Sequence, residues 1–194
     1  MNHLDDFKII EQVLEGRQEA YAILIERYEQ LVFTLALRML KNREDAEEAA
    51  QDVFVKAFKA LSKFKGESKF STWIYRITYN KCLDMLARIK RQPAAADIEE
   101  LTHMNLGEVE TIVDKMELEE RNAQIKKCIE RLPEDEAFLI TVYYFEDKSV
   151  NELVEIMGLT ESNIKIKLYR ARKRLFTMLN QILMDEKKGT YGEI

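Results

Sequence analysis

Side chains suited to reading duplex DNA gather near the end of the chain. At helical spacing, Ile164, Leu168, Ala171 and Leu175 fall on one apolar face. About a quarter turn away, a second face holds Asn163, Lys167, Arg170 and Arg174. Asn and Arg can form paired hydrogen bonds with base edges, whereas Lys mainly neutralises phosphate. The pattern predicts a helix that is anchored on its apolar side and places its basic side in a DNA groove.

The segment before this helix completes a familiar DNA-binding unit. Ser149 is suited to cap a short helix, Met157-Gly158-Leu159 is suited to a tight turn, and Thr160 is suited to cap the next helix. Two capped helices around a turn with a central Gly predict a helix-turn-helix. The alternative is an ordinary helical hairpin with a solvated basic face.

A second cluster, between Phe64 and Arg91, mixes aromatic and basic residues. Unstacked bases can stack on aromatic rings while phosphates pair with cations, so the mixture suits single-stranded DNA. The alternative is that the rings form a core. Helical spacing turns Trp73 and Ile77 towards the core and puts Tyr75 and Tyr79 on a different face.

A third segment, residues 44–55, is acidic at the start of an expected helix, where carboxylates complement the helix dipole. Its alternative is a plain solvated face. We find no catalytic set, since the chain lacks a Gly-rich phosphate loop and a nucleophile elbow. Two Cys and two His, widely separated, predict neither a disulfide framework nor a metal or cofactor site. Cys82 and Cys128 are expected to be core thiols, with redox sensing as the remote alternative.

Helices must position all three clusters, because 194 residues with 6 Gly and 2 Pro favour an all-α fold. The apolar spacing predicts helices at 6–15, 18–40, 42–64, 71–91, 114–131, 133–145, 149–156 and 160–184. Asn42 is expected to cap the third helix, and Ser71 or Thr72 the fourth. These form two small domains, 1–92 and 114–184, joined by an acidic linker at 93–113 and followed by a tail at 185–194.

The net charge of −5 counts against a nucleic-acid-binding protein until it is divided along the chain. Residues 1–92 hold 16 basic and 14 acidic groups, and residues 124–194 hold 12 of each. Residues 93–123 hold 2 basic and 9 acidic groups, so the negative excess belongs to the central stretch. The sequence has neither a signal peptide nor an apolar run long enough to span a membrane, and a cytoplasmic location is expected.

Three segments, in order, resemble the sigma-70 transcription initiation factors of the extracytoplasmic-function (ECF) group. The first runs from Gly16-Arg17-Gln18-Glu19-Ala20-Tyr21 to Arg38-Met39-Leu40 and continues with Asp45-Ala46-Glu47-Glu48-Ala49-Ala50-Gln51-Asp52-Val53-Phe54. The second and most specific is Phe70-Ser71-Thr72-Trp73-Ile74-Tyr75-Arg76-Ile77-Thr78-Tyr79-Asn80, followed by Asp84. The third runs from Leu132-Pro133 to Arg174-Leu175. The resemblance implies a region 2 domain at 1–92, a region 4 helix-turn-helix domain at 114–184, and no enzymatic activity.

The resemblance also implies roles for individual residues. Docking on the clamp helices of core RNA polymerase would use Glu48, Gln51, Asp52, Val55 and Lys56. Binding of the melted minus-ten element would use Lys65, Ser68, Lys69, Trp73, Tyr75, Arg76, Tyr79, Asn80 and Arg88. Duplex minus-thirty-five recognition would use Ser162, Asn163, Lys165, Lys167, Arg170 and Arg174.

The implied partners are core RNA polymerase, through its clamp helices and flap, promoter DNA, and an anti-sigma factor, with no direct membrane insertion. One departure stands out, since many members have Thr-Val-Lys-Ser-Arg where this chain has Asn163-Ile164-Lys165-Ile166-Lys167. We therefore expect groove contacts that differ from the family's. Two other functions fit parts of the sequence: a stand-alone helix-turn-helix regulator of duplex DNA, and a helical adaptor that binds only protein.

Overall fold

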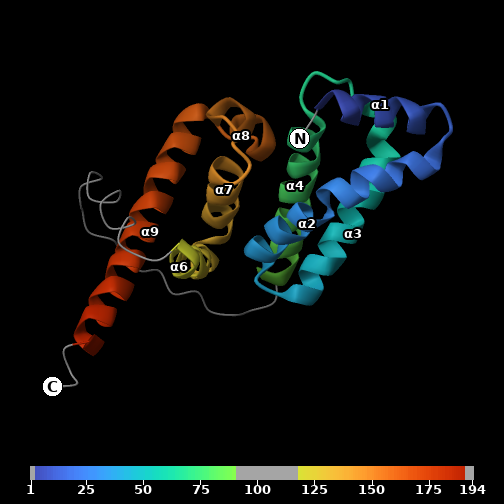
Figure 1. Cartoon of the computed structure of the whole chain (residues 1–194). Helices are drawn as coiled ribbons and strands as arrows, with labels where there is room; N and C mark the ends of the chain where they lie inside the picture. Colours follow the sequence, from blue (N-terminus) through green and yellow to red (C-terminus); the bar gives the residue numbers. More distant parts are fainter. Residues whose placement is uncertain (1–2, 91–117, 191–194) are drawn as a thin grey trace.

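The structure, a computed structural model, describes residues 3–90 and 118–190. The first part forms α1 (His3–Leu14), α2 (Tyr21–Leu40), α3 (Arg43–Ala60) and α4 (Phe70–Lys90), with short 3-10 turns at Gln18–Ala20 and Leu61–Lys63. The second part forms α6 (Leu118–Glu130), α7 (Glu134–Tyr144), α8 (Val150–Met157) and α9 (Glu161–Thr190). Figure 1 shows these parts as two groups of helices, called here the N-terminal and C-terminal domains. The predicted all-α class is confirmed, and the acidic linker lies outside the described residues.

Helix α9 is longer than its apolar spacing predicts. We expected it to end near Met184, but it continues to Thr190, so residues 185–190 are helical rather than part of a tail. The extension contains Asp185-Glu186-Lys187-Lys188. Glu and Lys are good helix formers that carry no apolar signal. Apolar periodicity therefore ends before the helix does.

The helix ends follow local chemistry. The Asn42 side chain accepts a hydrogen bond from the Asp45 backbone N–H at 3.0 Å and caps α3, as predicted. Ser149 forms a capping box with Glu152 at the start of α8. Thr160 caps α9 by accepting from the Asn163 N–H at 3.3 Å. Gly158 has a φ of 66° and ends α8 in the left-handed region, which favours Gly.

The N-terminal domain is held by the apolar faces of its three long helices. Leu24, Val32 and Leu35 of α2 are fully buried, as are Val53 of α3 and Ile74 of α4. These positions repeat at helical spacing, so each helix turns one stripe towards a common core. Burying each such side chain contributes about 1.5–3 kcal/mol before the entropy of ordering is subtracted.

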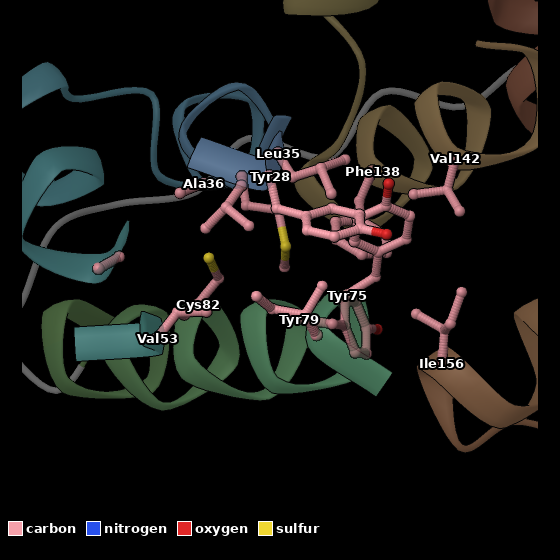
Figure 2. Close-up of a cluster of buried hydrophobic side chains, with 14 of the residues drawn as sticks. Tyr28, Leu35, Ala36, Val53, Tyr75, Tyr79, Cys82, Phe138, Val142 and Ile156 are labelled. Carbon is pink, nitrogen blue, oxygen red and sulfur yellow. The ribbon is translucent and has the colours of Figure 1, made fainter. Parts of the chain in front are cut away.

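The two domains pack directly on each other, an arrangement that we did not predict from the sequence. Helix α2 lies against α7, and α4 lies against α8. Figure 2 shows Tyr75 and Tyr79 of α4 near Phe138 of α7 and Ile156 of α8. The rings of Tyr79 and Phe138 have centroids 4.9 Å apart. One apolar core is therefore continuous across both domains.

Polar contacts hold the other edge of this interface. Arg38 of α2 donates to the Thr141 hydroxyl, and its guanidinium lies 5.4 Å from the centre of the Phe145 ring. Lys41, at the end of α2, donates to the backbone oxygens of Glu130 and Leu132. Glu130 is the last residue of α6 and Leu132 lies just beyond it, where carbonyl oxygens lack partners within the helix. The ammonium group of Lys41, in the N-terminal domain, therefore helps to cap α6 of the C-terminal domain.

Candidate functional site

Helix α9 has the two faces that its sequence predicts. Ile164, Leu168 and Ala171 are buried against the rest of the C-terminal domain, while Asn163 and Arg170 are exposed. Ser162 and Lys165 are also exposed, and Lys167 and Arg174 are partly exposed. The predicted base-reading residues near the start of the helix are therefore accessible to a DNA groove.

Carboxylates of the same domain pair with most cations of this face. Lys165 Nζ lies 2.5 Å from Glu161 Oε1, and Lys167 is paired with Asp135 of α7. Arg174 is paired with Glu136 of α7. Arg170 forms no direct ion pair with any residue that the structure describes. Arg170 is therefore the cation of this face that can meet DNA without first losing a partner.

The ion pair between Arg174 and Glu136 places a buried carboxylate beside a guanidinium without a hydrogen bond between them. Glu136 is 7% exposed at its side chain, and its Oε2 lies 3.3 Å from Arg174 Nε. The approach lacks hydrogen-bond geometry, and within the described residues neither atom has another hydrogen-bond partner. Burial raises the pKa of Glu136, an effect that outweighs the opposing attraction of Arg174.

Glu136→Gln is expected to stabilise the protein by about 1 kcal/mol at neutral pH, because burying a neutral amide costs less than burying a charged carboxylate. Folding raises the pKa of Glu136, so the wild type loses stability as pH rises through that folded-state pKa. Gln does not titrate, so its advantage should be smaller below pH 4.5, the ordinary value for Glu. Urea unfolding of both proteins at the two pH values tests this, and a pH-independent difference would contradict it.

Four aromatic rings support the loop before α4, residues 65–69. The Phe7 ring of α1 stacks on Phe64 at 5.8 Å, and Phe64 meets Trp73 at 5.2 Å and Phe70 at 5.8 Å. Gly66 has a φ of 73°, and an added Cβ there would lie 2.9 Å from the Phe7 ring. The loop therefore rests directly on Phe7. Trp73 is half-buried in this stack, so part of its ring remains available to a ligand.

Tyr75 and Tyr79 lie deeper than predicted. We expected them on a face separate from the core, but they are 1% and 5% exposed, whereas Trp73 and Ile77 are only partly buried. The cause is the C-terminal domain, which covers their side of α4 (Figure 2). The Tyr75 hydroxyl donates to Glu146 Oε2 at 2.9 Å, and burial raises the pKa of Tyr79 to about 12.

Ser71 and Thr72 are inside α4 rather than at its cap. The helix begins at Phe70, where the Trp73 N–H donates to the Lys69 carbonyl, so neither hydroxyl is needed to start it. Their side chains are buried under the C-terminal domain instead. We call Ser71, Thr72, Tyr75 and Tyr79 the docking face of α4.

The other residues predicted to bind single-stranded DNA lie at the surface around the docking face. Lys65, Arg76 and Asn80 are exposed, and Ser68 is partly buried. Lys69 is half-exposed, 4.0 Å from Glu152 of α8. Arg88, also exposed, lies further along α4, where it lines a pocket of about 280 Å³ with Asp45 and Glu48 of α3. Cations thus surround a docking face that is itself covered.

Sequence reasoning missed three residues that cover this face: Glu146, Lys148 and Glu152. Lys148 is 6% exposed, and its ammonium donates to Ser71 Oγ at 2.8 Å and Glu152 Oε1 at 3.3 Å. Thr72 Oγ1 donates to the same Glu152 oxygen at 3.3 Å. The capping pattern predicted Ser149 at the start of α8 but did not single out Glu152, and no local signal reports a Lys that is buried by a distant domain.

The predicted polymerase-binding residues form an exposed strip on α3. Glu48, Gln51, Asp52 and Lys56 are all exposed, and Val55 is 51% exposed. Asp52 is paired with Lys81 of α4. Beside the strip, Gln51 lines a groove of about 420 Å³ with Phe33 of α2 and Phe54 of α3. An apolar group in an acidic surround is suited to a protein partner.

The described residues include two cysteines, neither of which forms a disulfide. Cys82 and Cys128 are buried free thiols, as predicted, and burial raises the pKa of Cys82 to about 12. No group of three or more potential metal ligands is found among the described residues. Within them, no helix combines the length and apolarity that a membrane span needs.

Comparison with known proteins identifies both domains. Residues 24–92 match the family model described as Sigma-70 region 2, and residues 122–175 match the one described as Sigma-70, region 4. The chain is 28% identical to the RNA polymerase sigma-H factor of Pseudomonas aeruginosa, over 93% of this chain and 96% of that protein. It is 31% identical to the ECF RNA polymerase sigma-E factor of Escherichia coli, over 89% of this chain and 93% of that protein.

The fold has solved counterparts as well. The co-crystal structure of the sigma factor RpoE in complex with the anti-sigma factor NepR from Bartonella quintana aligns with a TM-score of 0.62. The identity is 20%, over 82% of this chain and 96% of that chain. At this identity the likeness concerns the fold alone.

Proposed function

Because the chain belongs to the ECF group of the sigma-70 family, we propose that it gives core RNA polymerase its promoter specificity through the residues described above. A sigma factor of this group recognises promoter DNA and promotes its opening. One observation carries the assignment to residues: a single chain presents an exposed base-reading face on α9, an aromatic and cationic region on α4, and an exposed strip on α3. A stand-alone duplex regulator would use only the first of these surfaces.

Duplex recognition at the minus-thirty-five element belongs to α9 in this proposal. Asn163 and Arg170 are exposed and can form bidentate hydrogen bonds with base edges. Ser162, Lys165, Lys167 and Arg174 supply phosphate contacts that fix the register of the helix. Three of these cations already have carboxylate partners. DNA binding must exchange those ion pairs for phosphate contacts, so the three phosphate contacts add little to the affinity for DNA.

Opening at the minus-ten element belongs to α4 and the loop at 65–69. Extruding a base from the duplex costs a few kcal/mol, and stacking on an aromatic ring returns about 1–3 kcal/mol. Trp73 offers the partly exposed ring, while Lys65, Lys69 and Arg76 offer cations beside it. Tyr75, Tyr79, Asn80, Ser68 and Arg88 complete the set that we assign to the displaced strand.

Polymerase docking belongs to the strip on α3, and Val55→Glu tests it. We expect the affinity for core polymerase to fall about tenfold or more, because a charge would be desolvated where an apolar side chain now docks. Val55 is exposed, so the fold should persist. Leu14→Glu is the matched control, since Leu14 is 52% exposed on α1, outside the strip. Fluorescence anisotropy with labelled protein measures both affinities, and equal losses would refute the assignment.

Further properties follow from the same proposal. The chain performs no covalent chemistry, acts in the cytoplasm with no direct membrane insertion, and also contacts the polymerase flap. The fold relative from Bartonella quintana is a sigma factor in complex with an anti-sigma factor. We extend that relationship to this chain and propose that an anti-sigma factor holds it inactive.

Transcription with purified components tests the proposed function. Core polymerase alone should not initiate at a defined start, and addition of the chain should produce transcripts of one length from a promoter template. A stand-alone duplex regulator would instead bind the promoter tightly without polymerase and leave the transcript pattern of the core unchanged. That result would overturn the proposed function.

A further inference from the structure

The face of α4 assigned to single-stranded DNA is occupied by the protein itself. Ser71, Thr72, Tyr75 and Tyr79 are each less than 6% exposed, and all four belong to the segment assigned to the displaced strand. The groups that cover them come from α7, α8 and the loop between these helices. A DNA strand and the C-terminal domain therefore require the same surface.

The covering groups resemble a nucleic acid in their chemistry. Glu146 accepts from the Tyr75 hydroxyl, and Glu152 accepts from Thr72 Oγ1 and lies 4.0 Å from Lys69 Nζ. Carboxylate oxygens here take the hydrogen bonds and ion pair that phosphate oxygens would take. The Phe138 ring lies against Tyr79 at 4.9 Å, as a base would in a stack.

Lys148 ties this cover to the docking face. Its buried ammonium has a partner in each domain, Ser71 in α4 and Glu152 in α8, and lies 5.8 Å from the centre of the Tyr75 ring. Burial alone would raise the pKa of Glu152, but hydrogen bonds from Ser149 and the charge of Lys148 outweigh it and keep the carboxylate charged. Leaving a buried ammonium group without one of its partners is strongly destabilising. We therefore expect the contacts of Lys148 with the two domains to form and break together.

We propose that the free chain is self-inhibited, with Glu146, Lys148 and Glu152 holding the C-terminal domain over the docking face of α4 so that displaced-strand DNA is excluded. The inference rests on the proposed function, which assigns that face to the strand. Promoter binding requires the domains to separate in any case. About 25 base pairs separate positions minus-thirty-five and minus-ten, which is about 85 Å of B-DNA at 3.4 Å per base pair. A compact chain of 194 residues has a radius of gyration of about 16 Å, so the docked domains cannot meet both elements at once. Polymerase would hold the open arrangement.

The test compares two double variants of the full chain. Glu146→Gln with Glu152→Gln removes the two carboxylates that meet α4, and Gln at 152 can still serve the capping box of α8. Asp147→Asn with Glu155→Gln removes two carboxylates from the same loop and helix. Both of these residues are exposed, and neither side chain has a hydrogen-bond or ion-pair partner among the described residues. The two variants have the same net charge.

The measurements are strand affinity and domain separation, both without polymerase. The probe is a fluorescein-labelled single strand of about 15 nucleotides from the minus-ten element of a promoter mapped for this protein. Separation is followed by energy transfer between labels at Ser62→Cys and Thr177→Cys, two exposed positions in different domains. The native thiols of Cys82 and Cys128 are buried and should not compete for the labels.

We expect the first variant to bind the strand about tenfold more tightly than the wild type, with reduced energy transfer, and the control variant to change less than about twofold. Lys148→Ala is the second opening variant: it should also reduce energy transfer and strengthen strand binding, although the loss of a positive charge alone would weaken it. Equal affinities for both double variants, or unchanged energy transfer in the opening variants, would overturn the inference. Transcription by the wild-type chain with core polymerase is scored separately, so that a failure there refutes the proposed function instead.

Discussion

Trp73→Ala should lower open-complex formation on a duplex promoter about tenfold to a hundredfold, since one lost base stack is worth about 1–3 kcal/mol. Trp73 is the partly exposed member of the ring stack with Phe64 and Phe70, next to the loop at 65–69. Polymerase affinity should be unchanged because the α3 strip is untouched. Permanganate footprinting of the melted region, at saturating holoenzyme, measures the effect.

Two comparisons separate a melting defect from damage to the fold. A template with a pre-melted minus-ten region should restore most of the lost activity, because the base no longer has to be extruded. Trp73→Phe should retain part of the activity, and Ile77→Ala, at another partly buried position on α4, should show little loss. Equal losses on duplex and pre-melted templates would show that Trp73 does not act in opening.

Asn163→Ala with Arg170→Ala should reduce initiation at promoters that depend on the minus-thirty-five element by about a hundredfold or more, at about 1–3 kcal/mol for each bidentate contact. Both residues are exposed on α9, and neither supports the buried face of that helix. Stability should therefore change little. Start-specific transcription with a library of minus-thirty-five sequences measures activity and base preference together.

The pattern of lost activity across that library distinguishes direct contacts with bases from charge contacts with phosphates. A base-reading Arg170 predicts relaxed preference at one or two positions, whereas a phosphate contact predicts uniform weakening and a lower salt dependence. Lys127→Ala, which removes one exposed cation from α6, should leave the preference intact. An unaltered base preference in the double variant would remove Asn163 and Arg170 from direct readout.

Local features of the fold could be predicted because they depend on neighbouring residues. Asn42, Ser149 and Thr160 cap helices as expected, since each needs only a backbone N–H three residues away. The buried stripe of α9 follows from helical spacing for the same reason. The end of α9 could not be predicted in this way, because residues 185–190 extend the helix without an apolar repeat.

Contacts between the domains could not be predicted from spacing. Tyr79 and Phe138 are 59 positions apart, and nothing local marks them as partners. The misplacement of Tyr75 and Tyr79 has the same origin: periodicity places a residue on a helix face but cannot say which distant element covers that face. Lys148 is the clearest example of this limit. It is buried, whereas a Lys with no known partner is expected at the surface.

The sequence predicts which residues form the candidate site, but not which of them are paired or buried in the free chain. The cations of α9 were expected to be available to DNA, yet Lys165, Lys167 and Arg174 are paired with carboxylates of their own domain. Tyr75 and Tyr79 were expected on a face separate from the core, yet the C-terminal domain covers them. A chain that pairs its own cations and covers a DNA-binding face binds DNA weakly without a partner.

Mapping of transcript 5′ ends shows whether this chain confers promoter specificity on core polymerase through two DNA elements. Genomic DNA from the source cells is transcribed by core polymerase with and without the purified chain. The proposed function predicts new start sites that appear only with the chain and share two sequence elements at a fixed separation. It also predicts that the Asn163→Ala, Arg170→Ala variant loses preference in the upstream element alone. No new start sites, or starts that share no upstream element, would contradict it.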